Sequence, residues 1–116
     1  MNSDQELLEL AAKAAGYRVC HFHSPVSVYV SDDLRNAWFF WAPLSNNADA
    51  LRLAVQLNIA IDPMVPDLQN CNSDEKFSVA LLPNKMRFSV LHGDDAEKAT
   101  RRAITRAAAE IGRAKP

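Results

Sequence analysis

A chain of 116 residues, of which 48% are hydrophobic and 23% charged, has the composition of a globular protein and the length of one domain. We therefore expect a single domain over residues 1–116. Thirteen basic and fourteen acidic side chains give a formal net charge of −1, which excludes the broad positive field that drives non-specific nucleic-acid binding.

The first six residues are polar and acidic, without the cationic start and apolar run of a secretory signal. The sequence also lacks a stretch of roughly 18 apolar residues, the length that spans a bilayer. These patterns predict a cytoplasmic protein without a membrane partner. Two cysteines, Cys20 and Cys71, do not make a disulfide framework, so we expect both thiols to be reduced.

The first predicted element is a helix over residues 4–15. Ser3 and Glu6 have the spacing of a capping box, in which a hydroxyl and a carboxylate accept hydrogen bonds from free backbone N–H groups. Leucines and alanines follow at three- and four-residue spacing as one apolar stripe. Gly16 suits the left-handed conformation that ends many helices.

From Tyr17 the apolar period changes to two, which predicts a strand that ends before Pro25. Alternating residues then predict a second strand over 26–30, and the apolar segment after the next turn predicts a third over 37–41. The turn-forming segment 31–33 favours a hairpin between these two strands.

A second helix is predicted over about residues 47–58, after several N-cap candidates in the segment 45–47. Its expected buried face consists of Ala50, Leu51, Ala54, Val55 and Leu57. The segment 61–75 contains two prolines and two asparagines and exceeds roughly 12 residues, the length above which structureless connections are uncommon. We expect it to be an irregular loop that is either functional or mobile.

The clearest predicted hairpin consists of strands over 77–82 and 86–90. The segment 93–95 opens a last helix, which carries a nearly all-alanine face and is expected to end before Gly112. Small side chains allow close packing, so this helix is expected to lie flat against a sheet. The predicted fold is α+β, with the order α-β-β-β-α-β-β-α, three helices and a mostly antiparallel five-stranded sheet.

The strand that contains Trp38, Phe39, Phe40 and Trp41 places large aromatic side chains on both faces of its sheet. Helices can cover both faces, as in a three-layer α/β/α sandwich. Alternatively, one aromatic face is an exposed contact surface for another protein or for a second copy of the chain. A buried core is the commoner of the two explanations, and these four residues are the candidate partner-binding residues.

The last predicted helix is basic on the face opposite its alanines. Arg101, Arg102 and Arg106 can contact phosphates there, which makes nucleic-acid binding an alternative function. No recognised nucleic-acid-binding motif accompanies them. Exposed arginines also solubilise a helix and complement its dipole, so nucleic acid is not the expected partner.

His21 and His23 lie two residues apart on a predicted strand, so their imidazoles project from one face and can share a metal ion. A metal-dependent enzyme is therefore a second alternative. A catalytic site needs a third ligand, which His92 or the pair Asp94 and Asp95 supplies only if the strands are adjacent. A half-exposed polar face is the commoner explanation of this spacing, so no cofactor is expected.

Nothing else in the sequence favours catalysis. Cys20 points away from His21 and His23 on an extended strand, which opposes a thiol nucleophile with a histidine base. The sequence also contains neither a glycine-rich phosphate loop nor a nucleophile elbow. We therefore predict that the chain is not an enzyme.

Three segments that together span nearly the whole chain carry a family resemblance. They are ELLELAAKAAG at 6–16, WAPL at 41–44 leading into DALRLAV at 49–55, and ATRRAI at 99–104 followed by RAAAEIG at 106–112. They resemble small bacteriophage and prophage proteins similar to the phage ABA-sandwich domain family. The resemblance implies a three-layer α/β/α fold and expression inside an infected bacterium, and it supplies no catalytic residues. Residues 61–75 match nothing in that family.

Together these patterns predict a phage or prophage accessory protein that acts by protein–protein contact in the cytoplasm of an infected or lysogenic bacterial host. Its expected contact surface is either the strand from Trp38 to Trp41 or the segment 61–75. The expected partner is a host or phage protein, or a second copy of the chain as a homodimer.

Overall fold

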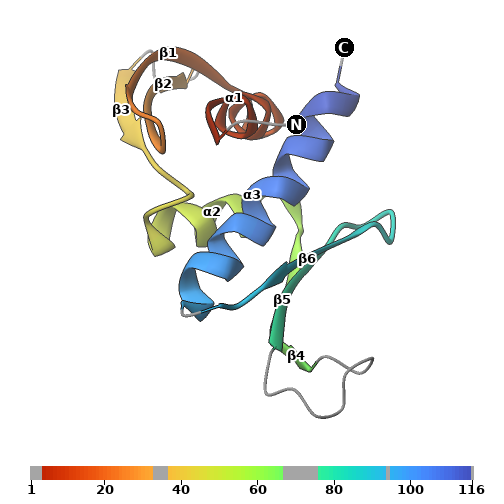
Figure 1. The fold of residues 1–116 in the computed structure, drawn as a ribbon. Helices are drawn as coiled ribbons and strands as arrows, with labels where there is room; N and C mark the ends of the chain where they lie inside the picture. The colour runs from red at the N-terminus through yellow and green to blue at the C-terminus, as the bar shows by residue number, and fades with distance from the viewer. Residues whose placement is uncertain (1–3, 33–36, 67–75, 94, 116) are drawn as a thin grey trace.

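A computed structural model describes residues 4–32, 37–66, 76–93 and 95–115 as an α+β fold (Figure 1). The three helices of these residues are α1 (Asp4–Ala15), α2 (Asn47–Leu57) and α3 (Ala96–Ala114). The first three strands are β1 (Tyr17–Ser24), β2 (Ser27–Asp32) and β3 (Ala37–Trp41). The remaining described strands are β4 (Ala60–Pro66), β5 (Lys76–Leu81) and β6 (Arg87–Leu91).

The strands form two antiparallel sheets of three, in the orders β1-β2-β3 and β4-β5-β6. The prediction of antiparallel hairpins is confirmed, whereas the prediction of one five-stranded sheet is wrong. Strand β4 was missed because Pro63 and Pro66 argue against regular structure. The structure accommodates both prolines in an edge strand with an irregular register between Asp62 and Val65, where a missing N–H group is tolerated. Residues 67–75 of the expected loop lie outside the described residues.

The helices lie between the two sheets (Figure 1). Helix α1 packs against β1 and β2, helix α3 packs against β5 and β6, and α1 and α3 pack against each other. This layering differs from the expected α/β/α sandwich, in which helices cover both faces of a single sheet. One face of the β1-β2-β3 sheet therefore turns toward helix α1, and the other face turns away from the helices.

The contact between α1 and α3 depends on a small residue. Gly112 lies inside α3, which continues to Ala114, so the expected helix end before Gly112 is wrong. A Cβ atom at Gly112 would overlap the carbonyl oxygen of Leu10 and would lie 2.8 Å from its carbonyl carbon. Glycine stands here because the backbone of α1 occupies the place of a side chain.

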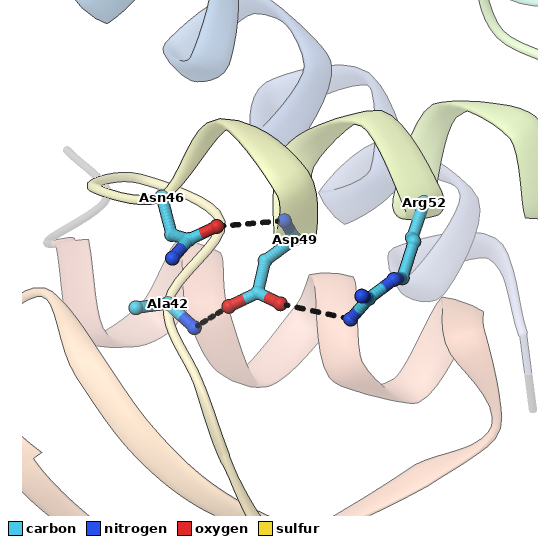
Figure 2. A network of polar contacts seen from close by, with 4 residues as sticks. All are labelled: Ala42, Asn46, Asp49 and Arg52. Carbon is cyan, nitrogen blue, oxygen red and sulfur yellow. Dashed lines mark hydrogen bonds and ion pairs between the residues drawn. The ribbon is translucent and has the colours of Figure 1, made fainter.

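The junction between β3 and α2 is held by a carboxylate (Figure 2). The Asn46 side chain caps the helix by accepting a hydrogen bond of 3.1 Å from the Asp49 backbone N–H. Asp49 accepts a 3.0 Å bond from the Ala42 N–H and lies 3.6 Å from the guanidinium of Arg52. These contacts set where the chain leaves β3, and they confirm the predicted helix start.

The buried face of α2 differs from the prediction by a rotation of the helix. Ala50, Leu53 and Ala54 are buried, whereas Leu51 and Val55 are 58% and 69% exposed. Both apolar faces satisfy the helical spacing, so the choice depends on where α3 lies against α2.

We predict that Gly112→Ala lowers the free energy of unfolding by about 3 kcal/mol, the upper end for overpacked sites, because the new methyl group meets rigid backbone. Gly16→Ala is the matched control. Gly16 has open space around its Cβ position but a φ of +83°, so its replacement costs about 1 kcal/mol. Urea unfolding followed by circular dichroism measures both changes. Equal losses in the two variants would contradict the close approach of α1 and α3.

Candidate interaction surface

The aromatic side chains of strand β3 lie in two environments, the core and the solvent-exposed surface. Trp41 is 4% exposed, and Phe39 packs against the core. The ring of Tyr17 meets both edge-on, with centroid distances of 5.2 Å to Phe39 and 5.7 Å to Trp41. Trp38 and Phe40 point the opposite way and are 65% and 47% exposed. Of the four candidate partner-binding residues, only Trp38 and Phe40 are available to a partner.

The sequence favours burial of both aromatic faces of this strand, whereas the structure buries only one face. Large side chains on both faces of a strand do not require a helix on each face, because one face of an antiparallel sheet can contact solvent. Helix α1 covers the inner face of the β1-β2-β3 sheet, where Val28 and Val30 are fully buried. The outer face keeps its aromatic residues in contact with solvent.

Trp38 and Phe40 belong to a larger set of rings on that outer face. Phe40 lies opposite Tyr29 in the β2–β3 register, with ring centroids 5.6 Å apart. The imidazole of His21 stacks on Tyr29 at 4.8 Å. The imidazole of His23 meets Tyr29 at 6.0 Å and Phe40 at 5.6 Å, edge-on in both cases. We name the group His21, His23, Tyr29, Trp38 and Phe40 the outer aromatic cluster.

Tyr29 also belongs to this surface, although no motif in the sequence singles it out. Its neighbours Val28 and Val30 are both buried, and alternation along a strand then turns Tyr29 outward. Next to the cluster, Ser31 lies between Arg18 and Trp38 in the registers of β1 and β3, and it is 3% exposed. The outer face therefore combines aromatic rings with one arginine and two histidines.

The two histidines share a face, as their spacing predicts, but the expected third metal ligands lie elsewhere. His92 follows β6, a strand of the other sheet, Asp95 is the N-cap of α3, and Asp94 lies outside the described residues. Among the described residues, no group of three or more His, Cys, Asp or Glu side chains is placed to hold a metal ion. His21 and His23 instead contact aromatic rings.

Cys20 lies at an irregularity of β1, where the register with β2 shifts between Val19 and His21. Desolvation raises the pKa of the Cys20 thiol, and the positive charge of Arg18 lowers it in opposition. The net effect is a raised pKa, so the thiol is protonated at neutral pH and is a weak nucleophile. Cys71 lies outside the described residues.

The candidate arginines of α3 mostly serve the fold. Arg101 donates 3.0 Å and 2.7 Å hydrogen bonds to the Leu44 carbonyl oxygen and to the Asn47 side chain. Arg102 forms a 2.9 Å ion pair with Asp4 at the start of α1. Arg106 is exposed. Two of the three residues expected to meet phosphates are thus engaged in contacts between helices.

A groove of about 300 Å³ lies between α2 and α3. Its lining is mainly apolar and includes Leu51, Ile61 and Ile104. The charged residues in it, Glu97 and Arg101, both bond to the side chain of Asn47. The groove is therefore an apolar surface, and its two charged side chains are both engaged by Asn47.

No family model, curated protein or solved structure matches the chain significantly. Across the described residues, no helix has the length and apolar character needed to cross a membrane.

We predict that the Cys20 thiol is alkylated more slowly at pH 7 than the same thiol in the urea-unfolded chain. The thiolate is the reactive form, and the folded environment raises the pKa. Iodoacetamide labelling across a pH series measures the midpoint, in a chain whose second cysteine is removed by Cys71→Ser. Arg18→Ala moves the midpoint to still higher pH, because the charge of Arg18 opposes the shift. A folded midpoint at or below the unfolded one would contradict the assignment.

Proposed function

We propose that this chain is a non-enzymatic accessory protein that works by protein–protein contact, with the outer aromatic cluster as its contact surface. The observation that carries the proposal is the exposure of Trp38 and Phe40, 65% and 47%, side by side on one sheet face. Following the family resemblance, the proposal includes a phage or prophage origin. The protein then acts in the cytoplasm of an infected or lysogenic bacterial host.

An exposed aromatic cluster is costly to keep in water unless something covers it. Tryptophan, tyrosine and phenylalanine are enriched in the buried centres of protein interfaces, where each contributes a large apolar area. Tryptophan and tyrosine are also among the commonest residues whose removal weakens an interface strongly. Trp38, Tyr29 and Phe40 have this composition, and the rings of Tyr29 and Phe40 contact each other and the neighbouring histidines.

The charge of the surface favours a protein over a nucleic acid. Backbone contact with a nucleic acid needs several lysines or arginines, and Arg18 is the arginine that the β1–β2 register places on this face. The formal net charge of the chain is −1, which provides no net attraction for a polyanion. The two histidines can form hydrogen bonds either with a protein partner or with solvent.

We predict that the double variant Trp38→Ser and Phe40→Ser loses at least about 90% of a specific host or phage protein captured by the wild-type chain, since such residues dominate interface energies. The measurement is quantitative mass spectrometry of proteins retained from a lysate of infected bacteria. Both side chains point away from the core, so the variant is expected to keep its fold. Circular dichroism checks this.

The matched control is Leu51→Ser with Val55→Ser, which removes apolar side chains of 58% and 69% exposure from helix α2 instead. This control is expected to retain the captured protein. Equal capture by the wild type and the Trp38/Phe40 variant, or loss only in the α2 control, would refute the assignment of the contact surface. Trp41 is not a suitable target, since it lies in the core at 4% exposure.

A further inference from the structure

Strand β3 is at the edge of its sheet. The order β1-β2-β3 pairs it with β2 on one side, and in Figure 1 its other side lies at the periphery of the described fold. All five of its residues follow the β2 register without interruption. An edge of this kind presents a row of backbone N–H and C=O groups that are ready to pair with another extended strand.

The other described edge strands carry features that discourage pairing. Strand β1 has register shifts between Val19 and His21 and between Phe22 and Ser24. Strand β4 contains Pro63 and Pro66 and a further shift. Strand β6 begins with the exposed charge of Arg87. Bulges, prolines and charges are the means by which edges avoid association, and β3 has none of them in the sequence AWFFW.

We propose that β3 pairs with β3 of a second copy of this chain, antiparallel and about a two-fold axis through Phe39. The β1-β2-β3 sheets of the two copies then become one continuous six-stranded sheet. Its order is β1-β2-β3 followed by β3-β2-β1 of the partner. This inference rests on the proposed function and names its partner and mode of contact.

The register follows from the directions of the side chains. Residues directly opposite each other on antiparallel strands point to the same face. A two-fold axis through Phe39 satisfies this requirement, because it sets Trp38 opposite the partner's Phe40 on the outer face. On the inner face it sets Phe39 opposite the partner's Phe39. In the same register Ala37 pairs with the partner's Trp41, so no tryptophan is paired with another tryptophan.

The side chains favour a second copy over an unrelated strand. Every position of β3 finds a partner within the same five residues, and no charge is left at the pairing edge. On the outer face, Trp38 and Phe40 of each copy gain an aromatic neighbour on the side that the monomer leaves open. A five-residue seam with four exposed rings lies at the small end of specific interfaces, below roughly 1,200 Å² of buried surface, so the dimer dissociates on dilution.

Sedimentation velocity of the purified chain over roughly 1 to 300 µM tests the pairing, since weak interfaces dissociate in this range. We expect a concentration-dependent dimer. The double variant Trp38→Lys and Phe40→Lys sets like charges opposite each other at two places in this register. It is expected to raise the dissociation constant by about tenfold or more. The control Leu51→Lys, on helix α2, is expected to dimerise as the wild type does.

Hydrogen exchange distinguishes edge pairing from any other dimer. Backbone N–H groups of β3 that face away from β2 are expected to exchange about tenfold more slowly at high than at low protein concentration. Those of β1, the opposite edge of the same sheet, are an internal control and are expected not to change. A wild-type chain that stays monomeric, a dimer insensitive to the lysine pair, or unchanged exchange in β3 would each overturn the proposal.

These outcomes are separable from a failure of the proposed function. A monomeric chain whose outer aromatic cluster still captures another protein would remove the dimer and leave the contact surface in place. A dimer with slowed β3 exchange that captures no other protein would support self-association as the contact.

Discussion

Helices α1 and α3 approach so closely that one methyl group at Gly112 would overlap the backbone of Leu10. Both helices carry buried alanines, among them Ala11, Ala103 and Ala107, which are at most 1% exposed. Large side chains would hold the helix axes further apart. Because the helices fill the middle of the fold, the two sheets lie on either side of them. Each sheet then needs only one apolar face, which leaves the other free for solvent or a partner.

Polar contacts hold the ends of this arrangement together. Arg102 joins α3 to Asp4 at the start of α1, and Lys115 donates to the Ala14 carbonyl oxygen at the end of α1. Arg101 joins α3 to Leu44, in the connection after β3, and to Asn47, at the start of α2. Several charged side chains that resemble a binding surface in the sequence therefore position elements instead. None of these contacts involves the outer aromatic cluster.

The outer aromatic cluster and the β3 edge are two aspects of one feature. Trp38 and Phe40 are exposed because β3 is the last strand of a sheet whose inner face alone meets a helix. The same position leaves the backbone of β3 open along one side. A face of rings beside an unprotected edge gives a partner both apolar area and directional hydrogen bonds, which together define orientation as well as affinity.

Local patterns in the sequence indicated most of the secondary structure: Gly16 ends α1, α2 begins after the N-cap candidates at 45–47, and the apolar segment 37–41 forms β3, whereas β4 was not predicted. These features depend on residues within a few positions of one another, so a linear pattern contains them. Only the tertiary structure decided that Gly112 lies inside a helix, that Leu51 and Val55 are exposed, and that Trp38 and Phe40 face outward while Phe39 and Trp41 are buried. Each of these outcomes depends on which element packs against the residue, and that element is distant in the sequence. Periodicity therefore identified the two faces of β3, and the packing of α1 on the neighbouring strands β1 and β2 selected the face that is buried.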